Sequence, residues 1–207
     1  MHSPRYARRP TIGDPYPISE DPEPSNTGTR FAAIVGMLTH RLIAEALEHA
    51  AAGRGDPGDI VLPRSQALAA GAEVGRRTRA CRIAIAAGAA IYLERFLLPD
   101  PWAFSGAEVD LGPGVRADVV WSGPGGVVID EVKTSDGRVA GRPSAGRASQ
   151  LRQLAEAGAG RYDEHQVAVR LIFLGAAAYS VVHRVGQPPV RLAYDPELGP
   201  RELRPWR

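Results

Sequence analysis

Residues 115–133 read VRADVVWSGPGGVVIDEVK. Two valine-rich runs, 115–121 and 127–133, flank a segment of three glycines and one proline. β-Branched runs on either side of such a turn-forming segment predict a β-hairpin. The first run carries Asp118 and the second carries Glu131 and Lys133, so the hairpin would bring three charged side chains together.

The direction of these side chains follows from strand geometry. Residues two apart on a strand point to the same face, so Glu131 and Lys133 would project together while Asp130 and Val132 project the other way. The hairpin would place Asp118 near the end of its own strand, beside the strand that carries Glu131. Two carboxylates and one ammonium would then meet at one end of the sheet.

Two carboxylates beside an ammonium suit the hydrolysis of phosphodiesters. Carboxylate oxygens bind Mg²⁺ or Mn²⁺ and leave coordination positions for water and phosphate. A neighbouring lysine can orient the water or stabilise the charge that develops on the phosphate. The alternative is structural: Glu131 and Lys133 form a pair on a solvated strand face, and Asp118 is unrelated to them.

Lys133 is the only lysine among the 25 lysine and arginine residues of the chain. The abundance of Ala, Gly, Arg and Pro indicates a bias under which arginine readily replaces lysine on the surface. Lysine is a compact charge with a tunable pKa, whereas arginine is a planar fork that stays protonated. A retained lysine is consistent with a chemical role at this position. Chance retention explains a single lysine equally well.

Helical and strand patterns extend on both sides of the hairpin. Helical periodicity covers 29–52 and 65–97, the second in one or two pieces, with a Gly-, Asp- and Pro-rich break at 53–63. Strand signals cover 102–111, 115–121, 127–133 and 166–175, a helix is predicted at 144–157, and 178–185 and 189–194 are candidate edge strands. This order predicts an α/β fold with a mixed central sheet flanked by helices, including an N-terminal helical segment.

Composition sets the wider limits. Of the 207 residues, 1–27 are predicted to form a flexible proline-rich arm, 28–195 one globular domain and 196–207 a polar tail. The net charge of +2 does not by itself indicate a nucleic-acid partner. The single cysteine, Cys81, excludes an internal disulfide and a cysteine-ligated metal site. The sequence shows neither a signal peptide nor an apolar run of ~18 residues, so we expect a cytoplasmic protein without a membrane partner.

Asp118, followed after twelve residues by Glu131-Val132-Lys133, resembles the Asp…Glu-x-Lys signature of the PD-(D/E)XK nuclease superfamily. The order of the predicted elements over 30–175 is also similar to that family's core. The resemblance implies a restriction-endonuclease-like core and a Mg²⁺- or Mn²⁺-dependent nuclease. It implies that Asp118, Glu131 and the carbonyl of Val132 bind the metal, that Lys133 positions the attacking water, and that the substrate is DNA in preference to RNA.

Two further patterns resemble the RecB and Cas4-like branch of that superfamily, whose members act in repair or genome defence. Gly36 and His40 match its Gly-x-x-x-His pattern on the first helix, which implies that His40 joins the metal site and that the glycine lets the helix approach the sheet. The branch also has a catalytic glutamine on the helix after the lysine strand. Gln150 or Gln153 would supply it, and we favour Gln150, although Leu154 stands where the branch often has tyrosine.

Two more predictions concern charged residues outside the triad. Glu108 is similar to an acidic position of some family members, and it fits equally well as a surface residue beside Arg116. Four arginines before the hairpin either contact nucleic-acid phosphates or form a solvated helix face: Arg76, Arg77, Arg79 and Arg82.

A second function is compatible with the same residues. The chain would then be a catalytically silent nuclease-like subunit that binds nucleic acid or a protein partner within a larger complex. The near-neutral charge and Leu154 favour this alternative. The intact set of Asp118, Glu131 and Lys133 opposes it, because a retired site has no physical need to keep two carboxylates beside an ammonium.

Overall fold

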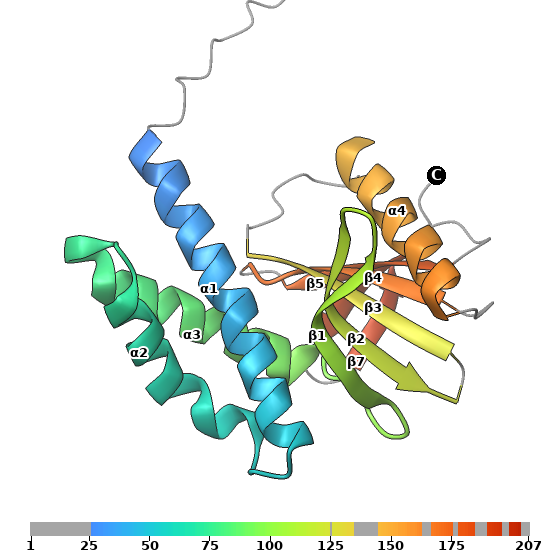
Figure 1. Ribbon diagram of the computed structural model, residues 1–207, viewed down its shortest axis with the longest axis horizontal. Coiled ribbons are helices and arrows are strands. Elements are labelled where there is room, and N and C mark those ends of the chain that lie inside the picture. Colours follow the sequence, from blue (N-terminus) through green and yellow to red (C-terminus); the bar gives the residue numbers. More distant parts are fainter. Residues whose placement is uncertain are drawn as a thin grey trace, which may run out of the picture.

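A computed structural model of the chain describes residues 26–124, 126–134, 145–162, 167–175, 178–184, 190–195 and 199–203 (Figure 1). The predicted arm at 1–27 lies outside the described residues, apart from its last two positions, which begin the first helix. Among the described residues, no helix is both long and apolar enough to cross a bilayer.

The N-terminal part of the described chain is a layer of helices, as predicted. It contains α1 (Asn26–Ala51), α2 (Val61–Gly71) and α3 (Thr78–Arg95), with short 3₁₀ turns at Pro57–Ile60 and Gly75–Arg77. The predicted break at 53–63 is too long, because α2 already begins at Val61. Pro63 falls in the first turn of α2, where its missing N–H has no helical partner to lose.

Among the described residues, a seven-stranded mixed sheet follows in the order β1-β2-β3-β4-β5-β6-β7. Neighbouring strands are antiparallel except β3 and β4, which are parallel and are joined through the crossover helix α4 (Ala145–Tyr162). The strands are β1 Ala103–Gly112, β2 Val115–Gly123, β3 Gly126–Lys133, β4 Val167–Phe173, β5 Tyr179–Arg184, β6 Val190–Asp195 and β7 Gly199–Leu203. The predicted α/β class, with a mixed sheet, flanking helices and an N-terminal helical segment, is confirmed.

The sheet is covered on both faces, by α1–α3 on one side and by α4 on the other (Figure 1). Alternate residues of one strand therefore enter different cores. On β2, Val119 and Trp121 pack among residues of α1–α3, whereas Val120 joins Leu151 and Leu154 of α4. The apolar character of β2 and β3 follows from this double burial.

The sheet extends further along the chain than the sequence indicates. Residues 199–203, assigned to the polar tail at 196–207, pair with β6 as β7. Gly199–Leu203 has no alternation of apolar and polar residues, so periodicity carries no signal for this strand. Outer strands are often polar because one edge has no neighbouring strand.

Asp130 forms a buried polar cluster on the face that α3 covers. Its carboxylate accepts hydrogen bonds from Tyr92 Oη at 2.7 Å, Trp121 Nε1 at 3.0 Å, and Arg170 Nε and Nη2 at 2.6 Å each. Arg170 also donates to the carbonyl of Phe96 at 2.9 Å. The cluster joins β2, β3, β4 and α3. Asp130 immediately precedes the predicted catalytic Glu131 on β3. The cluster also confirms that Asp130 and Glu131 face opposite sides of the sheet.

Candidate active site

Asp118 lies at a fork between β2 and β3. The two strands pair from Gly123↔Gly126 to Val119↔Asp130, and no further pair extends this ladder in the described structure. Beyond that point Asp118 Oδ2 accepts the N–H of Val132 at 2.6 Å, so a side chain takes the place of a backbone acceptor. The prediction that Asp118 is near the end of its own strand is wrong, because β2 continues to pair with β1 as far as Val115. It lies instead at the end of the β2–β3 pairing.

His40 reaches this fork from α1. Its Nδ1 lies 3.2 Å from Asp118 Oδ1, with the two side chains 23% and 15% exposed. Gly36, one turn earlier, permits the approach, since a Cβ added there would lie 3.2 Å from the Thr134 hydroxyl just after β3. The predicted close approach of the helix to the sheet at Gly36 is therefore present.

The electrostatic surroundings of His40 favour its protonated form. Burial lowers the pKa of His40, but the hydrogen bond to Asp118 and the charges of Asp118, Glu131 and Glu108 together raise it above its ordinary value. The carboxylates of Asp118, Glu131 and Glu108 thus place an excess of negative charge around this side chain. A divalent cation would satisfy the same charge.

Glu108 completes a group of three potential ligands. In the β1–β2 register it falls opposite Asp118, between the pairs Ala107↔Val119 and Val109↔Ala117. One ligand atom from each of His40, Glu108 and Asp118 lies within 4.8 Å of the other two. The backbone of Glu108 has φ 51°, a left-handed conformation that is rare for a residue other than glycine and costs free energy. The strained residue thus carries one of the candidate ligands.

Glu108 lies beside Arg116, as one of its two interpretations expects, and the match to an acidic family position stays a prediction. Its carboxylate belongs to the group with His40 and Asp118. It also forms an ion pair with Arg116, in which Arg116 Nε lies 2.9 Å from Glu108 Oε2. The sequence singles out Glu108 as a candidate, but it carries no glycine or asparagine signal for the left-handed backbone at this position.

Glu131, Lys133 and Gln150 form a second group beside the first. Glu131 Oε1 accepts hydrogen bonds from Lys133 Nζ at 2.5 Å and from Gln150 Nε2 at 2.7 Å. Glu131 is 6% exposed, and burial together with the charge of Asp118 raises its pKa despite the lowering effect of Lys133. Gln150 thus faces the site, while Gln153 is exposed and Leu154 is buried against the sheet.

The structure differs from the predicted ligand set in one respect. The group whose ligand atoms lie within 4.8 Å of each other consists of His40, Asp118 and Glu108, and it does not include Glu131. The carboxylate of Glu131 is held by Lys133 and Gln150. Val132 contributes its N–H to Asp118, and the ligand role of its carbonyl remains a prediction.

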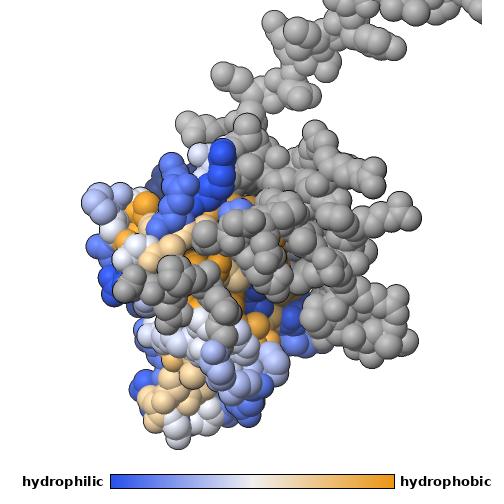
Figure 2. All heavy atoms as spheres, turned by 90° about the vertical axis from the view of Figure 1, so that its right-hand side faces the viewer, coloured by the Kyte–Doolittle hydropathy of each residue, from blue (hydrophilic) through white to orange (hydrophobic). Residues whose placement is uncertain are grey.

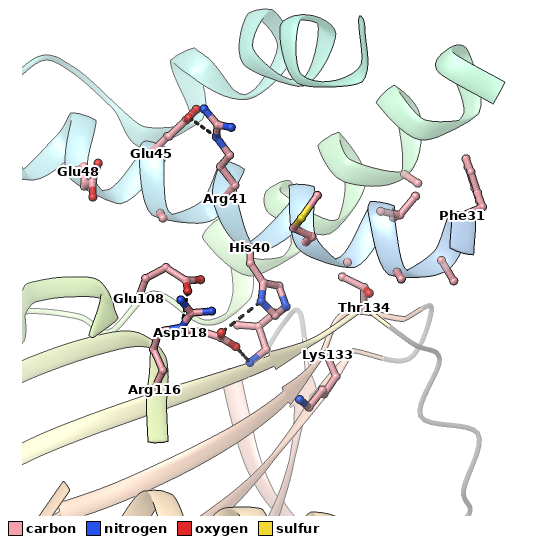
Figure 3. A pocket seen from close by; sticks show the side chains of 18 residues that line it. Phe31, His40, Arg41, Glu45, Glu48, Glu108, Arg116, Asp118, Lys133 and Thr134 are labelled. Carbon is pink, nitrogen blue, oxygen red and sulfur yellow. Dashed lines mark hydrogen bonds and ion pairs between the residues drawn. The ribbon is translucent and has the colours of Figure 1, made fainter. Parts of the chain in front are cut away.

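A cavity of about 1020 Å³ lies between α1 and the strands (Figure 3). His40, Glu108, Arg116, Asp118 and Lys133 line it, and Figure 3 shows His40 descending from α1 toward Asp118 while Glu108 and Arg116 come from the β1–β2 hairpin. The far end is lined by Phe31 and Val35 of α1. The cavity has room for a phosphate and its neighbouring groups next to all three candidate ligands.

The four predicted phosphate-binding arginines lie elsewhere. Arg76 and Arg77 are in the 3₁₀ turn before α3, Arg79 and Arg82 are on α3, and all four are exposed. None is among the described residues that line the cavity. Arg77 contacts one lining residue, since its guanidinium lies 5.3 Å from the ring centroid of Phe31.

The donor set fits a hard or borderline divalent cation. Carboxylate oxygens with one imidazole nitrogen suit Mg²⁺ and, better, Mn²⁺. On the face shown in Figure 2, hydrophilic and apolar residues are interspersed over the coloured atoms. Compared with models of protein families, with curated proteins and with solved structures, the chain matches none.

Proposed function

We propose that this protein is a Mg²⁺- or Mn²⁺-dependent nuclease of the PD-(D/E)XK type, in the RecB and Cas4-like branch, that hydrolyses phosphodiester bonds of DNA. One observation carries the proposal. His40, Glu108 and Asp118 offer ligand atoms within 4.8 Å of each other, in a cavity that Lys133 also lines. The resemblance of Asp118…Glu131-x-Lys133 to the family signature agrees with it.

Each residue has a defined task in this proposal. Asp118, His40 and Glu108 would hold the cation, which supplies Lewis-acid chemistry toward water and the phosphoryl oxygens. Lys133 and Glu131 present a donor and an acceptor side by side, so a water bound against the pair is oriented for attack. Gln150 keeps Glu131 in place from α4. Lys133 also offsets negative charge that develops on the phosphate.

A direct assay tests the proposal. Labelled single- and double-stranded DNA is incubated with the wild-type protein and Mg²⁺, Mn²⁺ or EDTA, and with the variants Glu131→Ala and Lys133→Ala. We expect metal-dependent cleavage that falls by at least about 100-fold in each variant. Glu48→Ala is the matched control, because Glu48 is an exposed carboxylate that lines the same cavity outside both groups. Cleavage that survives both site substitutions contradicts the catalytic assignment.

The silent-subunit alternative makes a different prediction in the same assay. Glu131 is engaged by two donors, an arrangement that also suits a purely structural carboxylate. If that role is the true one, folded wild-type protein will retain DNA in a gel-shift experiment without cutting it in any metal. A protein partner would then supply the cleavage.

A further inference from the structure

Two arginines and one lysine among the described residues line the cavity, and each is paired with a carboxylate. The pairs are Arg41 Nε with Glu45 at 3.0 Å, Lys133 Nζ with Glu131 at 2.5 Å, and Arg116 Nε with Glu108 at 2.9 Å. Only the last pair shares a carboxylate with the group His40, Glu108 and Asp118. A cation bound by that group and the guanidinium of Arg116 would therefore draw on the same carboxylate.

The Arg116–Glu108 pair is of the kind that separates easily. The side chains are 69% and 39% exposed, and pairs in such surroundings contribute little net stability. A divalent ion attracts the Glu108 carboxylate more strongly than a solvated guanidinium does, because it is a compact double charge within ligand distance. A cation on Glu108 would therefore weaken the hold of this carboxylate on the guanidinium of Arg116 at the edge of the cavity.

We propose that Arg116 is a phosphate-binding residue that becomes available when the metal binds. Binding of the cation to His40, Glu108 and Asp118 releases Arg116 from Glu108, and the guanidinium then takes a phosphate oxygen of the nucleic acid. The planar fork of arginine matches the oxygens of a phosphate, and both Arg116 and Asp118 line the same cavity from β2. The inference rests on the metal site of the proposed function, and it makes binding ordered, with metal before DNA.

Arg41 provides a matched control for this role. It lines the same cavity and is 60% exposed, close to the exposure of Arg116. Its partner Glu45 also accepts two hydrogen bonds from Arg64, at 2.8 and 2.7 Å, and is not among the candidate ligands. Metal binding therefore leaves Arg41 paired, and its removal tests for a general effect of lost positive charge.

The experiment measures two affinities of the wild-type, Arg116→Ala, Arg116→Lys and Arg41→Ala proteins. Mn²⁺ affinity is read from the electron paramagnetic resonance signal of free Mn²⁺. Affinity for a fluorescein-labelled DNA oligonucleotide is read from anisotropy, with Ca²⁺ in place of the catalytic metal and in parallel with EDTA. Arg116 is exposed and outside the core, so the variants keep the fold, and circular dichroism checks this.

Opposite changes in the two affinities are expected for Arg116→Ala. Mn²⁺ should bind more tightly than to the wild type, because the competitor for Glu108 is gone. The oligonucleotide should bind about tenfold more weakly with Ca²⁺ and equally well in EDTA. Arg116→Lys should lie between, and Arg41→Ala should leave both affinities within about twofold of the wild type, in line with the small worth of exposed pairs.

Two results overturn the inference while leaving the proposed function in place. One is an unchanged oligonucleotide affinity in Arg116→Ala when the wild type binds Mn²⁺ and cleaves DNA. The other is an equal loss of oligonucleotide affinity with Ca²⁺ and with EDTA, which would show ordinary charge attraction. A wild-type protein without saturable Mn²⁺ binding contradicts the proposed function itself, and this inference with it.

Discussion

At the scale of single residues, the site depends on a side chain that accepts a hydrogen bond in place of a backbone carbonyl. This side chain is that of Asp118, in which one oxygen replaces the missing ladder partner of Val132 and the other faces His40. The carboxylate is therefore oriented before any ligand arrives. Such preorganisation reduces the cost of assembling a metal site.

The first residue-scale prediction concerns Glu108. Glu108→Gln removes one charged ligand from the group with His40 and Asp118, so Mn²⁺ affinity should fall by at least about tenfold. Titration calorimetry measures it. Glu48→Gln, which removes an exposed carboxylate of the same cavity, should change the affinity little. Equal affinities for Glu108→Gln and the wild type would remove Glu108 from the ligand set.

The second residue-scale prediction concerns pH. The pKa of His40 is raised, so its contribution to the stability of the metal-free protein is present below about pH 6.5 and is lost as pH rises through the higher folded value. A metal needs the neutral imidazole, so binding must release that proton. Mn²⁺ affinity should therefore rise between about pH 6 and pH 8. In His40→Ala the slope of affinity against pH should become shallower, and an unchanged slope would contradict the ligand role.

Several of these residues are predictable from the sequence, and others are not. The shared face of Glu131 and Lys133 follows from strand periodicity. The approach of His40 is expected only from the resemblance of Gly36 and His40 to a Gly-x-x-x-His pattern. The position of Glu108 close to His40 and Asp118 is not predictable, since it depends on the pairing of β1 with β2. The sequence likewise does not show that the Glu131 carboxylate is held by Lys133 and Gln150.

At the scale of secondary-structure elements, the buried cluster around Asp130 holds the strands that carry the site. Burial and the charge of Asp130 raise the pKa of Tyr92 well above its usual value, so Tyr92 stays a hydrogen-bond donor. Arg170 on β4 neutralises the carboxylate from the neighbouring parallel strand. The sequence separations of 38 and 40 residues put these partners beyond the reach of local pattern reading.

The element-scale prediction compares two arginines. Arg170→Met leaves the buried Asp130 carboxylate without its ion-pair partner and should lower the free energy of unfolding by about 3–5 kcal/mol. Arg64→Met breaks the partly exposed pair with Glu45 and should cost about 1 kcal/mol or less. Urea denaturation measures both. Similar losses in the two variants would show that the Asp130 cluster has no special weight.

At the scale of the whole molecule, the chain brings α1 and a mixed sheet together at one cavity. The order of elements from the first helix to β4 is readable from periodicity and turn residues, because apolar runs of fixed period precede clear glycine and proline breaks. β7 is not readable, since a polar outer strand such as Gly199–Leu203 resembles a loop in composition. The sheet is consequently wider than the sequence indicates.

Cleavage of DNA by Asp118→Asn tests the central claim most directly, since Asp118 contacts both His40 and the backbone of β3. The substitution keeps the shape of the side chain and removes the charge that a cation needs. We predict Mn²⁺-dependent hydrolysis of a labelled oligonucleotide by the wild type, no hydrolysis in EDTA, and a rate at least about 100-fold lower in Asp118→Asn. Hydrolysis in EDTA, or an unchanged rate in folded Asp118→Asn, would contradict the account.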